Sequence, residues 1–253
     1  MISVIIPLGK THTSHSSFAD RIRSLEFAIK TFYSKHDNIE IIVVVQNSDW
    51  SNKNVTFIHV NNEIFNKAWL INIGARKAKG TVLCVAESDM WADTPFLNEV
   101  EKYLLSENLL WCFGWNRIYY TTSSEKERLL SGIIPSISTV EKKMSRPSRG
   151  LKEGGFVFFR KKFYFSIGGH NERFQWLGGI DNEIALRAQK ASGQYNSFPQ
   201  IVFHLHHLPT NKNLGIFREM NKKLLRETTR NPMAISKALS LSSWGNPECP
   251  ILY

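Results

Sequence analysis

Cysteine is scarce in this sequence of 253 residues, which has only Cys84, Cys112 and Cys249. The three are odd in number and widely spaced, and none belongs to a Cys-x-x-Cys pair. This pattern indicates neither a disulfide framework nor a zinc site, and it favours inert buried thiols.

Long hydrophobic runs are absent as well. The longest run, residues 39–45, contains Glu40 and has the length of a strand, whereas a membrane-spanning helix needs roughly 20 apolar residues. The first strand is expected to begin at Ser3, which leaves no room for a secretory signal. The sequence therefore predicts a cytoplasmic globular protein without a transmembrane segment.

Apolar residues and positive charge are plentiful by contrast. Hydrophobic residues make up 42% of the chain and aromatic residues 12%, enough for a large core in one α/β domain or a domain with an appendage. The net charge is +10, and Lys and Arg are dense in 142–162 and 212–230. These stretches fit an anionic partner, and they fit solvated basic faces equally well.

Apolar runs of strand length alternate with helical periodicity along the chain. Strands are expected at 3–8, 41–46, 55–60, 81–86, 156–160 and 200–206. Helices are expected at 22–35, 66–78, 96–106, 161–167, 181–192 and in a basic amphipathic tail at 214–240. Residues 110–120 are rich in aromatics, and 121–153 are predicted to form a long loop or lid. Because the strands are almost wholly apolar, we expect a mostly parallel sheet covered by helices on both faces, with ligands beyond the carboxyl ends of its strands.

Two carboxylates follow the apolar strand at 81–86. Glu87 and Asp89, separated by Ser88, can direct oxygen atoms into the ligand crevice and hold a divalent cation. The alternative is a turn with two solvated acids.

Three histidines end the strand predicted at 200–206. A buried imidazole needs a partner for each ring nitrogen, so His204, His206 and His207 are hard to explain as core residues. Alternation along a strand predicts that His204 and His206 share a face. If Asp89 and a histidine bind one ion, Mn²⁺ fits better than Mg²⁺ because imidazole suits a softer metal.

The stretch FQWLGGIDNEIALR at 174–187 holds more polar residues than a helix start needs. Asp181 or Asn182 could cap the helix. Gly178 and Gly179 allow a ligand to approach the backbone closely. Asp181 at the helix start is favoured in its ionised form and can accept a proton from a hydroxyl group.

Other residues near this stretch have a structural and a functional interpretation. Glu183 is expected to pair with Arg187 at i,i+4. Trp176 is either a wall for a sugar or another planar ligand, or a core residue. The glycine pairs at 154–155 and 168–169 bracket a strand and a helix that lead into the stretch, and either pair could be a simple turn.

Taken together, five segments resemble the nucleotide-sugar-dependent glycosyltransferases of GT-A fold, most closely the β-1,4-galactosyltransferase and polypeptide N-acetylgalactosaminyltransferase group. The similar segments, in order, are VVVQN at 43–47, FNKAWLINIGARKA at 65–78, ESD at 87–89, EGGFVFFRKKF at 153–163 and WLGGIDNE at 176–183. The similarity covers roughly residues 3–207.

The resemblance implies a GT-A, Rossmann-like α/β fold with a C-terminal helical extension. The implied division is a glycosyltransferase domain at 1–209, with a nucleotide-sugar half at about 1–93 and an acceptor half at about 94–209, followed by a basic helical extension at 210–253. It also implies a UDP-sugar donor and a bound Mn²⁺ or Mg²⁺ ion.

The resemblance also implies a role for individual residues of the site. Asp89 would bind the metal, with His204 as the first choice of histidine ligand and His206 and His207 as competitors. Asp181 would be the general base of a reaction that inverts the anomeric centre, while the metal neutralises the departing diphosphate. The residues implied to contact the donor are Pro7, Arg21, Arg23, Gln46, Asn66, Lys67, Glu87, Ser88, Gly154, Gly155, Trp176, Gly178 and Gly179.

Three departures limit the resemblance. Glu87 replaces the first Asp of the metal motif, Ile180 replaces a Glu that helps to hold the acceptor sugar, and Lys152 replaces a donor-selecting aromatic residue. The donor is therefore not assumed to be UDP-galactose, nor is the acceptor assumed to bind as in galactosyltransferases. Because a Golgi anchor and its disulfides are missing, the expected protein is a cytoplasmic enzyme of a bacterium or virus, with binding at a membrane surface left open.

Three functions remain open at this point. The first is transfer of a sugar to a saccharide or a lipid-linked glycan. The second is the same chemistry on modified bases of a nucleic acid, which the charge and the aromatic residues at 111–120 would favour. The third is a non-catalytic module that binds nucleic acid or a membrane surface through the helix at 212–230.

Overall fold

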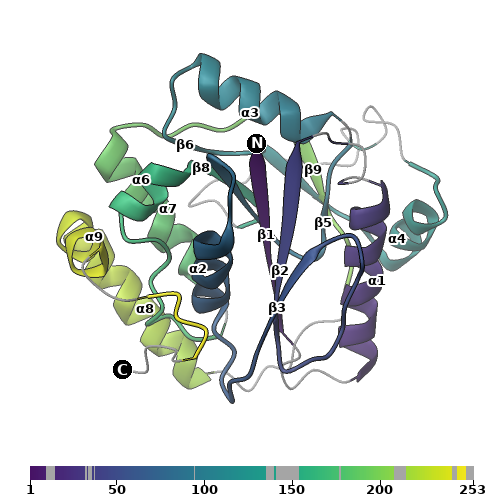
Figure 1. Cartoon of the computed structure of the whole chain (residues 1–253), viewed down its shortest axis with the longest axis horizontal. Coiled ribbons are helices and arrows are strands. Elements are labelled where there is room, and N and C mark those ends of the chain that lie inside the picture. Colours follow the sequence, from purple (N-terminus) through teal and green to yellow (C-terminus); the bar gives the residue numbers. More distant parts are fainter. Residues whose placement is uncertain are drawn as a thin grey trace.

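A six-stranded sheet forms the centre of the molecule (Figure 1). The computed structural model describes residues 1–9, 15–31, 33, 36, 38–93, 95–134, 140, 154–176, 178–207, 215–240 and 244–248. The strand order is β3-β2-β1-β4-β8-β6. The strands are β1 (Ile2–Gly9), β2 (Ile39–Gln46), β3 (Thr56–Val60), β4 (Val82–Ala86), β6 (Trp111–Phe113) and β8 (Phe156–Arg160). β1 to β4 run parallel and β8 runs antiparallel to both of its neighbours, so the predicted mostly parallel sheet is confirmed.

A second, three-stranded sheet is placed beside the first. It has the order β5-β9-β7, with β5 (Met90–Trp91), β7 (Arg117–Tyr120) and β9 (Ile201–His204). In the antiparallel pair of β5 and β9, Met90 lies opposite His204. This register brings the segment that follows β4, residues 87–90, next to the end of β9.

Helices cover the central sheet. In Figure 1, α1 and α4 lie to one side of the strands and α6 to α9 lie to the other, with α2 between these groups. Their bounds are α1 (His15–Thr31), α2 (Lys67–Lys77), α3 (Phe96–Ser106), α4 (Ser123–Leu130), α6 (Lys161–Ser166), α7 (Ile180–Ser192), α8 (Gly215–Arg230) and α9 (Pro232–Ser240). Among the described residues, no helix is both long and apolar enough to cross a membrane.

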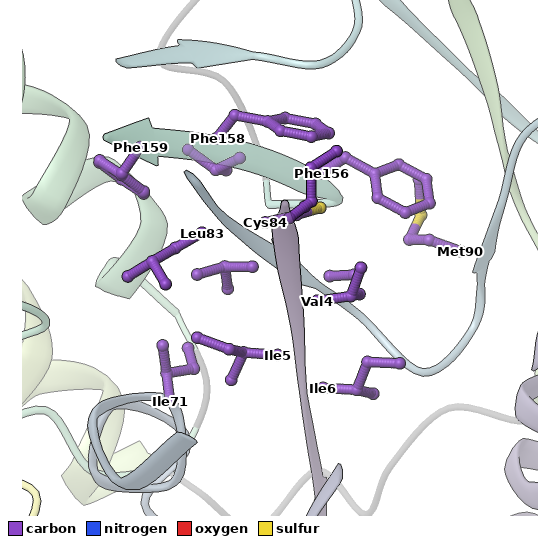
Figure 2. Close-up of a cluster of buried hydrophobic side chains, with 14 of the residues drawn as sticks. Val4, Ile5, Ile6, Ile71, Leu83, Cys84, Met90, Phe156, Phe158 and Phe159 are labelled. Carbon is purple, nitrogen blue, oxygen red and sulfur yellow. The ribbon is translucent and has the colours of Figure 1, made fainter. Parts of the chain in front are cut away.

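The core lies on both faces of the central sheet because its middle strands have no polar face. All five residues of β4 are buried. Figure 2 shows side chains from β1, β4 and β8 packed together, with Ile71 of α2 beside them. Burial of each large apolar side chain contributes about 1.5–3 kcal/mol, so this cluster fixes the strands whose ends carry the site. Cys84 and Cys112 are buried as predicted, whereas Cys249 lies outside the described residues.

The structure differs from the predicted elements in several places, and β5, β6 and β7 are strands that the sequence did not predict. A helix, α4, occupies part of the loop or lid predicted at 121–153, and a capping box between Thr122 and Glu125 starts it. α1 begins before residue 22 and ends before residue 35, and β9 ends at His204 rather than at residue 206. The rest of that predicted lid, at 135–139 and 141–153, lies outside the described residues and includes Lys152.

The C-terminal helices pack on α7. The Thr228 hydroxyl of α8 donates to Glu183 Oε1 at 3.2 Å, and the Asn221 amide donates to the carbonyl oxygens of Gln175 and Gly178 at 2.8 Å and 3.1 Å. α8 is therefore fastened to the loop that precedes α7.

Candidate active site

Asp89, His204 and His207 form a compact group. One possible ligand atom from each lies within 4.8 Å of the other two. His207 Nε2 is 3.2 Å from Asp89 Oδ2, and His204 Nε2 is 3.9 Å from Asp89 Oδ1. The backbone brings them together, because the amide of Leu205 donates to the carbonyl oxygen of Asp89 at 2.8 Å.

This group fits a divalent metal ion. Asp89 is buried, and within the described part of the chain its Oδ1 atom has no hydrogen-bond partner. A buried carboxylate oxygen without a partner is costly unless a cation or water satisfies it. One carboxylate and two imidazoles also form a mixed oxygen and nitrogen set, which suits Mn²⁺ better than Mg²⁺.

His206 is not part of the group. Strand alternation paired His204 with His206, but the structure pairs His204 with His207 because β9 ends at His204 and the chain leaves the strand geometry there. The amide of His206 donates to Thr121 Oγ1 at 2.8 Å, which anchors this turn.

A cavity of about 130 Å³ adjoins the group of Asp89, His204 and His207. It lies beyond the carboxyl end of β1, the position at which ligands bind on such sheets. Its lining includes the predicted donor residues Pro7, Arg21, Lys67, Glu87 and Ser88, together with Asp89, His204 and His207. Arg21 and Lys67 give the cavity two cationic side chains and Glu87 and Asp89 give it two carboxylates, so a cation bound at Asp89 would make it suit an anionic ligand.

A larger cavity of about 500 Å³ holds Asp181. Lys67, Glu87 and His204 line both cavities, which makes the two adjoining parts of one cleft. The other residues of the larger cavity are Met90, Ile118, Tyr120, Gly154, Gly155, Gly178, Gly179, Ile180, Asp181 and Asn182. The candidate metal ligands and the predicted base thus face a shared space.

Lys67 joins the two predicted acids. Its Nζ atom lies 2.8 Å from Glu87 Oε1 and 3.1 Å from each carboxylate oxygen of Asp181. The side chain of Lys67 is 7% exposed, against 33% for Glu87 and 22% for Asp181. Lys67 is the first residue of α2, and the Asn66 side chain caps that helix by accepting from the amide of Trp69. The helix start therefore fixes the backbone of Lys67, from which the side chain reaches both carboxylates.

The charges in this cluster shift one another's pKa. Burial alone lowers the pKa of Lys67, but the carboxylates of Asp181 and Glu87 outweigh burial and raise it above the usual value. For Glu87, burial raises the pKa. The Lys67 ammonium lowers it by more, so the net change is downward. For Asp181, burial raises the pKa, Lys67 opposes this, and the neighbouring Glu87 charge adds to the rise, so the net change is upward. The pKa of Asp181 is thus raised overall, but the Lys67 ammonium holds it below the level that burial and the Glu87 charge alone would give.

Gly154 and Gly155 let these acids approach the backbone. A Cβ atom on Gly154 would collide with Glu87 Oε1 and lie 3.0 Å from Asp181 Oδ2. The carbonyl oxygen of Gly154 accepts from Trp115 Nε1 at 3.0 Å, and that of Gly155 accepts from the amide of Glu87 at 3.2 Å. Residue 154 therefore has to be glycine for the cluster to keep this geometry.

Asp181 lies in the first turn of α7 rather than at its cap. The N-cap is Gly179, which has a left-handed backbone (φ 83°) and no side chain to cap the helix. The prediction that Asp181 or Asn182 caps α7 is therefore wrong. Because the carboxylate of Asp181 does not cap the helix, it can accept hydrogen bonds from Lys67 and line the larger cavity.

Four of the predicted donor residues have structural partners and line neither cavity. The Gln46 amide donates to the carbonyl oxygens of Asn62 and Ile64, and Asn66 caps α2 and donates to the carbonyl oxygen of Glu172. The exposed Arg23 pairs with Glu127 at 2.9 Å. Trp176 is buried against Phe65 and Phe217, so its interpretation as a core residue is the one that the structure supports.

The predicted pair of Glu183 and Arg187 is confirmed. Arg187 donates to both carboxylate oxygens of Glu183, at 2.8 Å and 2.7 Å. Both side chains are fully buried, and Arg187 also donates to the carbonyl oxygens of Ile167 and Gly169. The pair ties α7 to the turn after α6.

Five residues of the larger cavity are missing from the sequence-based site: Met90, Ile118, Tyr120, Ile180 and Asn182. Tyr120 is 53% exposed and packs against the His204 ring. Asn182 Oδ1 is buried and lacks a hydrogen-bond partner within the described residues. The position of Asn182 next to Asp181 is a sequence signal that could have placed it in the site. Tyr120 has no such signal, because the pairing of β7 with β9 that brings it here is a tertiary feature.

The structure resembles solved glycosyltransferases of GT-A fold. It matches GalNAc-T7 with UDP, GalNAc and Mn²⁺ (TM-score 0.59, 16% identity, 95% of this chain and 51% of that chain). It also matches S. aureus TarS 1-349 with UDP-GlcNAc (TM-score 0.56, 11% identity, 91% of this chain and 66% of that chain). A third match is the mannosyltransferase PcManGT from Pyrobaculum calidifontis with GDP-Man and Mn²⁺ (TM-score 0.53, 15% identity, 95% of this chain and 73% of that chain).

These likenesses establish the fold. No family model matches the chain, and no curated protein matches it by sequence. The chain spans about half to three quarters of the length of the three solved structures. It has the GT-A glycosyltransferase fold, which confirms the fold that the five segments implied.

Proposed function

We propose that this chain is a metal-dependent inverting glycosyltransferase that moves a sugar from a nucleoside diphosphate to a hydroxyl acceptor, with Asp181 as the general base. One observation carries the proposal. The Asp89, His204 and His207 group and the Asp181 carboxylate face adjoining cavities that share Lys67, Glu87 and His204.

The smaller cavity would hold the diphosphate of the donor. Asp89, His204 and His207 would bind Mn²⁺, which supplies a Lewis acid that neutralises the leaving diphosphate. Arg21 and Lys67 add positive charge at the same cavity. Three solved structures of the same fold contain UDP, UDP-GlcNAc or GDP-Man, so the donor is a UDP- or GDP-linked sugar under this proposal.

The larger cavity would hold the acceptor and the sugar to be transferred. Asp181 would take the proton of the acceptor hydroxyl as its oxygen forms a bond to C1 of the sugar. The bond from C1 to the diphosphate oxygen breaks on the opposite face, so the configuration at C1 is inverted. Tyr120, with more than half of its side chain exposed, offers a flat apolar face against which an acceptor sugar could rest.

The exposed face of α8 favours an anionic acceptor. It carries Arg218, Lys222, Lys223, Arg226 and Arg230, all exposed, and the buried Asn221 fastens this helix to Gly178 at the rim of the larger cavity. An anionic glycan, a lipid head group or a nucleic acid would lie along this face. If the acceptor is anionic, its binding should weaken steeply as the salt concentration rises. Binding that does not depend on salt would rule out an anionic acceptor on α8.

Thermal unfolding with a panel of nucleotide sugars tests the proposal. A ligand that binds only the folded state raises the melting temperature, so one UDP- or GDP-sugar should stabilise the protein when Mn²⁺ is present and much less with a chelator. The selected donor should then yield free nucleoside diphosphate on incubation with an acceptor extract. If no nucleotide sugar stabilises the protein and polyanions bind strongly, the chain is a non-catalytic binding module on the same fold.

A further inference from the structure

We propose that Lys67 couples donor binding to the general base: its ammonium holds Asp181 until the donor diphosphate draws it away. This inference rests on the proposed function and concerns the same site. It makes Lys67 a positioning residue whose partner changes when the donor binds.

Lys67 is a direct partner of the Asp181 carboxylate. The ammonium lies 3.1 Å from both carboxylate oxygens of Asp181 and 2.8 Å from Glu87. A carboxylate that accepts from an ammonium through both oxygens is stabilised in its charged form, and it is a poorer proton acceptor than a free one. Asp181 therefore has to lose this partner, at least in part, before it can take the proton of a hydroxyl.

The position of Lys67 allows such an exchange. Its side chain lines both the diphosphate cavity and the cavity of Asp181. The backbone of Lys67 is fixed at the start of α2 by the Asn66 cap, so a rotation of the long, flexible side chain is enough to redirect the ammonium. A diphosphate in the smaller cavity would offer this ammonium strong anionic acceptors close by.

The charges around Lys67 oppose entry of the donor unless the ammonium changes its partner. One ammonium faces the two carboxylates of Glu87 and Asp181, so this cluster carries a net negative charge that opposes the entry of an anion. If the ammonium turns to the diphosphate and keeps its contact with Glu87, only the contact with Asp181 is lost. The base is then free when, and only when, a donor occupies the neighbouring cavity.

The coupling has a consequence for binding that does not depend on catalysis. Because a donor must break the contact between Lys67 and Asp181, removal of the Asp181 charge should tighten nucleotide binding. We expect Asp181→Asn to lower the dissociation constant of UDP with Mn²⁺, or of GDP with Mn²⁺, by about tenfold, since close charge pairs commonly couple at this strength or more. Titration calorimetry measures this change.

The control is the same substitution in a Lys67→Met variant, which lacks the ammonium but keeps an unbranched side chain of similar length. There, Asp181→Asn should change the dissociation constant by less than about twofold. An equal gain in both backgrounds would mean that Asp181 acts by simple charge repulsion, and it would overturn the proposal. The proposal would be equally overturned if Asp181→Asn left binding unchanged or weakened it in the native background.

A second measurement covers the case in which Lys67→Met fails to fold. In a crystal structure of the native chain with UDP and Mn²⁺, Lys67 Nζ should lie within hydrogen-bond distance of a phosphate oxygen and beyond it from Asp181. An ammonium that stays on both oxygens of Asp181 with UDP bound would contradict the exchange. If neither UDP nor GDP binds to the native chain, the proposed function itself fails, which is a different result from failure of the coupling.

Discussion

Nε2 of His207 lies 3.2 Å from Oδ2 of Asp89, although the two residues belong to distant segments of the chain. The backbone bond from Leu205 to Asp89 and the pairing of Met90 with His204 bring these segments together. The arrangement selects two of the three clustered histidines and leaves His206 out.

The three histidines therefore provide a matched pair of variants. We expect His207→Gln to remove most of the stabilisation that Mn²⁺ gives to the protein, because one of three ligands is lost. His206→Gln should keep it within experimental error. Thermal unfolding with and without Mn²⁺ measures both variants, and an equal loss in both would show that the group is assigned wrongly.

Transfer activity should depend on pH through Asp181. Burial raises the pKa of this carboxyl, Lys67 opposes the rise and Glu87 adds to it, with a net shift upward. Because the base works in its deprotonated form, kcat should fall as pH drops through a value above about 3.9, the ordinary pKa of aspartate. Asp181→Asn should lower kcat by about 10²–10⁴-fold and abolish this limb.

The measurement is kcat against pH at saturating donor and Mn²⁺, so that weaker ligand binding in acid does not contribute. A rate that stays level down to pH 4, or an Asp181→Asn variant with native kcat, would show that another group is the base.

Gly154 should be intolerant of even a methyl group. Gly154→Ala places a Cβ atom against Glu87 Oε1 and close to Asp181, which should push both acids away from Lys67 and lower kcat by roughly 10²-fold. Gly215→Ala is the control, because a Cβ atom there meets nothing within 4 Å. Steady-state kinetics of the two variants should differ sharply, and native activity in Gly154→Ala would contradict the geometry of the cluster.

The buried pair of Glu183 and Arg187 should matter for stability rather than for chemistry. Arg187→Met leaves the Glu183 carboxylate buried without its ion partner, and we expect it to lower the free energy of unfolding by about 3–5 kcal/mol. Arg23→Ala removes an exposed pair with Glu127 and should cost less than about 1 kcal/mol. Denaturant unfolding compares them, and similar losses would mean that burial of the pair has been misjudged.

The sheet and the order of its motifs could be predicted from the sequence because their signals are local. Strands such as β4 are wholly apolar, and Glu87, Ser88 and Asp89 follow it directly, so a crevice at this end is expected from the run of residues alone. α4 also carries a local signal, the capping box of Thr122 and Glu125, but polar residues around it resemble a loop.

The partners inside the site could not be predicted, because they depend on tertiary contacts. The resemblance placed Lys67, Glu87 and Asp181 in the same site, yet nothing in their spacing indicates that one ammonium bridges both acids. Gln46 follows a strand just as Glu87 does, but its amide turns to backbone carbonyl groups instead of the cavity. Strand alternation favoured His206 because the end of β9 at His204 is set by its neighbours.

The most direct test of the account locates the metal ion. Crystals grown with UDP and Mn²⁺ should give an anomalous scattering peak at the manganese absorption edge, within coordination distance of Asp89, His204 and His207 and adjacent to the diphosphate. A peak at another place, or bound UDP with no ion at these three side chains, would contradict the central claim that they form the metal centre of a glycosyltransferase.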